Sequence, residues 1–140
     1  MCMAVYIAAD APLPLVGWNE AQPGFHVSEL SREDDEKVRG QFSKPYIYYA
    51  GAHTYCACGF DYGRNPKYQD DVEESRQSVA GLSEYLVRET ALHGSIELYA
   101  CWEGDQAEKP NSRKVITAGE IGGESFWFEE RQFLVIKPAG

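Results

Sequence analysis

The sequence predicts an α+β fold, in which a mostly antiparallel or mixed sheet carries one long helix. Residues 69–93 have the acidic start, apolar spacing and terminal glycine of such a helix. Short segments before and after it have the composition of strands. The chain has 140 residues, of which 44% are hydrophobic. This is the usual size of one domain with its own core, so we expect a single domain over residues 1–140.

The N-terminal part contains segments with strand-like composition. Residues 2–9 form a continuous apolar run, which is typical of a buried strand, and the prolines that follow end it because proline cannot donate to a sheet. Residues 15–18 are expected to be a short extended piece. Residues 25–30 alternate in polarity, and residues 46–50 are aromatic and β-branched. We expect both of these segments to be strands.

A short helix is expected at about residues 32–39. Ser31 and Asp34 have the spacing of a capping box with Asp in the place of the usual Glu or Gln, and Gly40 can end the helix. Its acidic residues come early and its basic residues late, as the helix dipole favours. We expect this helix to present a charged, solvated surface.

The long helix is expected at about residues 69–93. Pro66 precedes it, acidic residues crowd its first turns, and Gly94 can occupy the position that ends a helix. Four apolar residues form a stripe along it that we expect to pack on the sheet: Val72, Val79, Leu82 and Leu86.

The C-terminal part again favours strands. Residues 95–102, 114–117, 126–128 and 133–137 are rich in β-branched and aromatic residues. Residues 119–123 contain three glycines and are expected to be a flexible connection. The last two apolar segments are expected to be two strands that pair as a hairpin.

The charge balance bears on partners and location. Acidic residues outnumber basic residues 22 to 13, and the formal net charge is −9. Such a surface repels the phosphates of nucleic acids and anionic lipids, so we expect neither partner and favour a basic protein instead. No apolar run approaches the ~20 residues that span a bilayer. We therefore expect a cytoplasmic protein with free cysteines rather than disulfides.

A glycine-bounded loop carries the main candidate site. His53, Cys56 and Cys58 offer one imidazole and two thiols, which are the ligand types that zinc prefers. The sequence does not require a cofactor, but these three residues could hold zinc. Three residues elsewhere in the chain compete to be the fourth ligand: Cys2, His93 and Cys101.

Two alternative interpretations of Cys56 and Cys58 remain open. Residues i and i+2 of a strand have Cα atoms about 6.5 Å apart, near the limit for a disulfide. A turn at Ala57 would allow a strained, reducible disulfide and hence thiol-redox chemistry. The other interpretation is that both cysteines are small hydrophobic residues of the core.

Tyrosines are concentrated around this loop. Tyr55, Tyr62 and Tyr68 are candidates for a binding face, because tyrosine combines an apolar ring with a polar hydroxyl. Ordinary packing between strands would account for them equally well.

Three functional hypotheses follow. The first is a small acidic interaction protein without catalytic activity, such as an accessory, inhibitor or immunity-like protein. It rests on the charge, the aromatic content and the lack of a catalytic motif. The second is a thiol-redox or metal-binding protein that uses Cys56 and Cys58. The third is a small enzyme with a Cys–His site.

Overall fold

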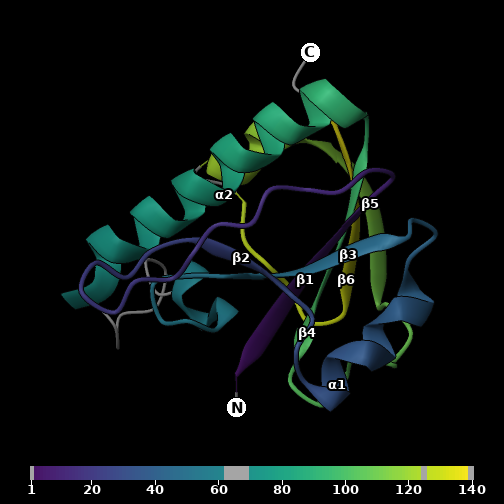
Figure 1. The fold of residues 1–140 in the computed structure, drawn as a ribbon, viewed down its shortest axis with the longest axis horizontal. Coiled ribbons are helices and arrows are strands. Elements are labelled where there is room, and N and C mark those ends of the chain that lie inside the picture. The colour runs from purple at the N-terminus through teal and green to yellow at the C-terminus, as the bar shows by residue number, and fades with distance from the viewer. Residues whose placement is uncertain (1, 62–69, 124–125, 139–140) are drawn as a thin grey trace.

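A six-stranded mixed sheet forms the centre of the protein, and a long helix crosses one of its faces (Figure 1). The computed structural model describes residues 2–61, 70–123 and 126–138. The order of the strands is β2-β3-β1-β4-β6-β5. The α+β class, the mixed sheet and the long helix predicted from the sequence are confirmed.

The strands are β1 Met3–Ala9, β2 His26–Glu29, β3 Tyr46–Gly51, β4 Ile96–Trp102, β5 Ser112–Thr117 and β6 Gln132–Lys137. The α-helices are α1 Glu33–Glu36 and α2 Val72–His93. Short 3₁₀ helices within the described residues include η1 Lys37–Gln41, η2 Ala57–Phe60 and η5 Ala118–Gly122. The short helix expected at 32–39 is present as α1 followed directly by η1.

The strand β1 lies at the centre and is antiparallel to both of its neighbours, β3 and β4. All of its residues are buried. Met3, Val5 and Ile7 belong to the core under α2, whereas Ala4 and Tyr6 belong to a second cluster on the opposite face. Because both faces of β1 are covered, its sequence is a continuous apolar run rather than an alternating one.

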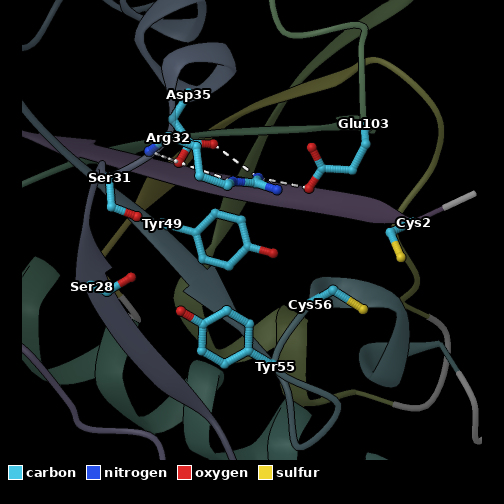
Figure 2. Close-up of a pocket in the computed structure, with 9 residues that line it drawn as sticks. All are labelled: Cys2, Ser28, Ser31, Arg32, Asp35, Tyr49, Tyr55, Cys56 and Glu103. Atoms are coloured by element: carbon cyan, nitrogen blue, oxygen red, sulfur yellow. Dashed lines mark hydrogen bonds and ion pairs between the residues drawn. The ribbon is translucent and has the colours of Figure 1, made fainter.

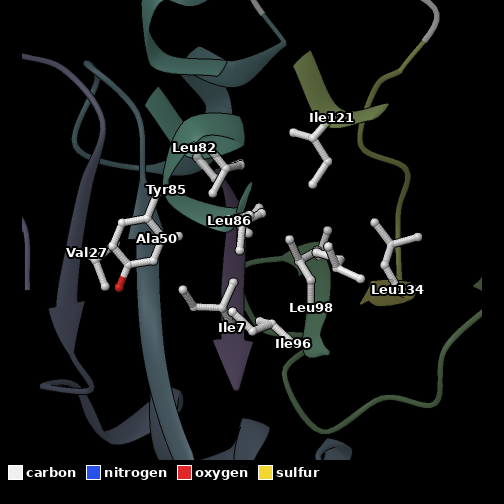
Figure 3. Close-up of a cluster of buried hydrophobic side chains, with 14 of the residues drawn as sticks. Ile7, Val27, Ala50, Leu82, Tyr85, Leu86, Ile96, Leu98, Ile121 and Leu134 are labelled. Atoms are coloured by element: carbon white, nitrogen blue, oxygen red, sulfur yellow. The ribbon is translucent and has the colours of Figure 1, made fainter. Parts of the chain in front are cut away.

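The helix α2 packs on the sheet through the middle of its length (Figure 3). Leu82 and Leu86 are fully buried as predicted, and Tyr85 joins them. The other two members of the predicted stripe, Val72 and Val79, are only partly buried.

Small serines take the buried positions near the start of α2. The Ser75 hydroxyl donates to the Phe60 carbonyl, and the Ser78 hydroxyl accepts from the His53 backbone N–H. Loop backbone therefore lies close against this end of the helix, and its polar groups need hydroxyl partners that valine cannot supply.

The prediction of a strand at residues 126–128 is wrong. Phe126 and Phe128 lie in irregular backbone and pack against the core, with the rings of Phe128 and Phe60 5.6 Å apart. The expected hairpin is also absent, because β6 pairs with β4 on one side and with β5, in parallel, on the other. Both edges of β6 are therefore occupied, and no further strand can join it.

The flexible connection expected at residues 119–123 is instead largely helical. Residues 118–122 form η5, which Thr117 and Glu120 begin with a reciprocal capping box. Ile121 is fully buried in the core cluster that also contains Leu82 and Leu86. The glycines therefore occur within an ordered turn whose apolar residue anchors it to the core.

No helix within residues 2–61, 70–123 and 126–138 combines the length and apolar composition needed to cross a membrane.

Alkaline solution is expected to destabilise the protein. Burial raises the pKa of Tyr99 to about 12 and also raises the pKa values of Tyr6, Tyr49 and Tyr85. A group with a raised pKa in the folded state stabilises that state below its unfolded pKa, here about 10, and the stabilisation is lost as the pH rises further. Urea denaturation should therefore give a falling free energy of unfolding between pH 9 and 11. A free energy that stays constant over this range would contradict the prediction.

Candidate three-cysteine metal site

The topology of the sheet brings three chain segments together at one end of β1. Antiparallel pairing of β1 with β3 and β4 places the start of β1 beside the ends of both neighbours. Cys2 precedes β1, the loop with Cys56 and Cys58 follows β3, and Glu103 follows β4. The Glu103 backbone N–H donates to the Cys2 carbonyl over 2.8 Å, which holds two of these segments side by side.

A tight turn shapes the cysteine loop. The Tyr55 N–H donates to the Ala52 carbonyl, and the Ala52 N–H donates to the Cys56 carbonyl, both over 3.0 Å. Tyr55 has a φ of 72°, a left-handed conformation that is uncommon for a residue with a side chain. Cys56 then precedes η2, which contains Cys58. The chain therefore turns between the two cysteines instead of running straight as a strand.

His26 supports this turn from the edge strand β2. Its buried Nε2 lies 2.7 Å from the Tyr55 carbonyl, and its ring stacks on the Tyr55 ring with centroids 4.9 Å apart. Burial lowers the pKa of His26, which favours the neutral ring with its proton on Nε2. A Cβ at Gly51 would lie 2.1 Å from both Nε2 of His26 and the Tyr55 carbonyl oxygen. Glycine is therefore needed at position 51 for this contact.

The sulfur atoms of Cys2, Cys56 and Cys58 all lie within 4.8 Å of one another. The Met3 backbone N–H points at the Cys58 sulfur, with N and Sγ 3.1 Å apart. Thiolates bound to zinc at about 2.3 Å in tetrahedral geometry are about 3.8 Å apart, so small side-chain rotations would suffice. The three cysteines lie close enough to hold a metal ion.

The structure unites Cys56 and Cys58 with Cys2, and it places His53 elsewhere in the loop. The buried His53 ring has Nδ1 3.3 Å from the Ser78 hydroxyl and Nε2 3.6 Å from an Asp71 carboxylate oxygen. His53 is therefore turned toward α2, and its role as a ligand stays a prediction. Of the three residues considered for the fourth ligand, Cys2 is the one that joins the cluster.

The other two candidates have different surroundings. His93 lies in the last turn of α2, with Nε2 3.6 Å from a Glu89 carboxylate oxygen. Cys101 is fully buried in the cluster on the face of the sheet opposite α2, and burial raises its pKa to about 12.

Contact between the thiols separates their pKa values. A hydrogen bond with the Cys58 thiol is the main reason that the pKa of Cys56 falls to about 5, and it outweighs the opposing effect of burial. The same contact, together with burial, raises the pKa of Cys58. The two thiols therefore titrate as a pair, which loses its first proton more readily and its second less readily than isolated cysteines would.

A pocket of about 190 Å³ opens beside this cluster (Figure 2). Cys2 and Cys56 lie side by side at one end of it, and the Tyr49 ring crosses its middle. The pocket is lined by Cys2, Ser28, Ser31, Arg32, Asp35, Tyr49, Tyr55, Cys56 and Glu103.

A closed ring of hydrogen bonds holds the polar wall of the pocket. The Arg32 guanidinium donates to Asp35 over 3.0 Å and to Glu103 over 2.8 Å. The Gln106 amide donates to Glu103 over 2.9 Å and to the Tyr6 hydroxyl over 3.2 Å, and Tyr6 donates to Asp35 over 2.6 Å. Burial opposes ionisation of Asp35, but hydrogen bonds from Arg32 and Tyr6 outweigh it and lower its pKa. The positive charge of Arg32 is thus balanced by two carboxylates.

The sequence does not single out Arg32 or Glu103 as site residues. It places Tyr49 among the tyrosines concentrated around the cysteine loop, but not among the three that are candidates for a binding face. These residues come from three separate segments, and their spacing in the chain carries no signal of a shared pocket.

The tyrosines proposed as a binding face are described only in part. Tyr55 is exposed beside the pocket, and its ring meets the Trp18 ring edge-on with centroids 5.3 Å apart. Tyr62 and Tyr68 lie outside the described residues.

Comparisons of the chain with protein-family models, curated proteins and solved structures find no match. The basis for a functional proposal is therefore the local geometry of the three cysteines and their pocket.

Proposed function

We propose that this protein binds a zinc ion through the thiolates of Cys2, Cys56 and Cys58. The observation that carries the proposal is the approach of all three sulfur atoms to within 4.8 Å of one another. Their residues come from two segments that are far apart in the chain and that the pairing of β1 with β3 brings together. The three sulfur atoms therefore come together only when the protein is folded.

The chemistry of the cluster favours zinc. Thiolate sulfur is a preferred zinc ligand, and the ion stabilises the deprotonated form of each thiol that it binds. The Met3 N–H that points at Cys58 would also stabilise negative charge on that sulfur. The net charge of −9 makes the surroundings favourable for a cation.

Zinc is expected to protect the three thiols together. Metal-free protein should react with a thiol-specific reagent first at Cys56, because its pKa is lowered to about 5. Adding one equivalent of zinc should suppress labelling of Cys2, Cys56 and Cys58 in parallel, since one ion would hold all three as ligands. Peptide mass spectrometry after brief labelling measures each site, and elemental analysis measures the bound zinc. Unchanged labelling, with no zinc retained after gel filtration, would contradict the proposal.

Thiol–disulfide exchange is a second candidate function, favoured by the lowered pKa of Cys56 next to two other thiols. The Cys56 thiolate would attack a disulfide substrate, form a mixed disulfide and release one substrate thiolate. The thiol of Cys2 or Cys58 would then lose its proton to solvent and attack the Cys56 sulfur, which forms an internal disulfide and releases the second substrate thiolate. Rapid formation of an internal disulfide when metal-free protein meets oxidised glutathione would support this function.

The two other hypotheses from the sequence stay predictions. A basic protein partner is still suggested by the net charge of −9. A Cys–His enzyme is still suggested only by the residue types in the loop.

A further inference from the structure

The cysteine cluster offers three protein ligands, one fewer than zinc usually takes. Within the described residues, the group of metal-binding atoms at this place consists of the three cysteine sulfurs. Of the residue types that commonly bind zinc, which are Cys, His, Asp and Glu, the undescribed residues contain one, Glu124. Structural zinc sites have four protein ligands, whereas sites with three leave a position for water or another small molecule. The three cysteine sulfurs thus correspond to a zinc site in which one ligand position is left for water or another small molecule.

The pocket lies where an exchangeable ligand would reach the metal. Cys2 and Cys56 both line it, so an ion held by their sulfurs would lie at its wall. Figure 2 shows the two thiol groups at the same end of the pocket as the Tyr49 hydroxyl. The volume of about 190 Å³ has room for a small molecule.

Tyr49 provides an independent indication of a ligand. Its side chain is only 7% exposed and lines the pocket. Arg32 lies over its ring, 5.7 Å from the centroid, and the Tyr6 ring packs edge-on against it. Its hydroxyl has no hydrogen-bond partner within residues 2–61, 70–123 and 126–138. The hydroxyl faces the open pocket, so a molecule bound there would be within reach as its hydrogen-bond partner.

The charges around the pocket determine whether a fourth metal ligand would be anionic or neutral. Arg32 is already paired with Asp35 and Glu103. A zinc ion with three thiolates carries a further net charge of about −1. An anionic ligand would therefore meet excess negative charge, whereas a neutral oxygen or nitrogen donor would not.

We propose that this pocket holds an exchangeable fourth zinc ligand, which is water or a small neutral molecule with a nitrogen or oxygen donor, hydrogen-bonded to the Tyr49 hydroxyl. The inference rests on the proposed zinc function and adds that the metal is open to ligands. The ion is then positioned to bind and polarise a small neutral substrate.

Substitution of cobalt for zinc tests whether the metal has an exchangeable fourth ligand. Co²⁺ bound in place of zinc should give thiolate-to-cobalt charge-transfer bands and visible bands that report its coordination. Titration with imidazole, a neutral nitrogen donor, should shift the visible bands to a saturating end point. Azide, a small anion, should bind at least about tenfold more weakly, because the pocket has excess negative charge.

Tyr49→Phe provides the matched variant, because it removes one hydroxyl and keeps the ring. It should retain the charge-transfer bands and bind imidazole about three- to tenfold more weakly, in line with the loss of one hydrogen bond. Glu129→Gln, which lies outside the pocket, should behave as the unaltered protein.

The outcomes separate the two proposals. Absence of charge-transfer bands would overturn the zinc function itself. Charge-transfer bands with visible bands that imidazole does not alter would leave the metal site intact and overturn the open position. Tighter binding of azide than of imidazole would overturn the neutral ligand class, and an unchanged imidazole affinity in Tyr49→Phe would overturn the role of Tyr49.

Discussion

Replacing Leu86 by Ala is expected to lower the free energy of unfolding by about 2–5 kcal/mol. Leu86 is fully buried on the inner side of α2, facing the sheet residues Ile7 and Leu98 (Figure 3). The substitution removes apolar contacts and leaves a cavity that the surrounding sheet can fill only in part. Urea denaturation at 25 °C measures the change, and the m-value should stay the same if the fold is retained.

Leu92→Ala is the matched control for this prediction. It makes the same chemical change in the same helix, but Leu92 is 68% exposed. Its effect on the free energy of unfolding should stay within about 0.5 kcal/mol. Equal effects of the two substitutions would show that α2 does not pack through Leu86.

Cys56→Ser is expected to weaken zinc binding more than about 100-fold. Changes to groups that merely support a metal ligand cost 10–100-fold, so loss of a thiolate ligand should cost more. Serine keeps the size of the side chain but replaces the thiolate with a neutral hydroxyl. Competition with a chromophoric chelator measures the affinity. Zinc at 100 times its Kd should raise the free energy of unfolding of the unaltered protein by about 2.7 kcal/mol, and the same concentration should have little effect on the variant.

The other cysteines provide the comparison. Cys2→Ser and Cys58→Ser should weaken zinc binding to a similar extent, because their sulfurs belong to the same group. Cys101→Ala should leave the zinc affinity unchanged, since Cys101 is buried in the cluster on the other face of the sheet. A loss of zinc affinity in Cys101→Ala, or none in Cys56→Ser, would refute the three-cysteine site.

Errors in predicting the elements occurred where neighbours in space outweighed local sequence. Residues 126–128 have strand composition, but β6 is already paired on both sides and no edge is left for them. Val72 and Val79 fit a helical stripe, yet serines take the buried positions because loop backbone there needs hydrogen bonds. Composition gives the secondary structure that a segment favours locally, whereas the neighbouring strands and loops decide which structure it adopts in the fold.

The sequence by itself determined the α+β class, the course of α2 and the position of most strands. Those features depend on periodicity, capping residues and turn residues within short stretches of chain. It also indicated Cys56 and Cys58, which are separated by one residue, as candidate metal ligands, and the structure places both within reach of one ion.

Only the tertiary structure decided that Cys2 joins them and that Tyr49, Arg32 and Glu103 form the adjoining pocket. The physical reason is the antiparallel pairing of β1 with β3 and β4, which sets the start of one strand beside the ends of two others. Strand order and register arise from burial across the whole sheet, and the spacing of residues within any one segment does not record them.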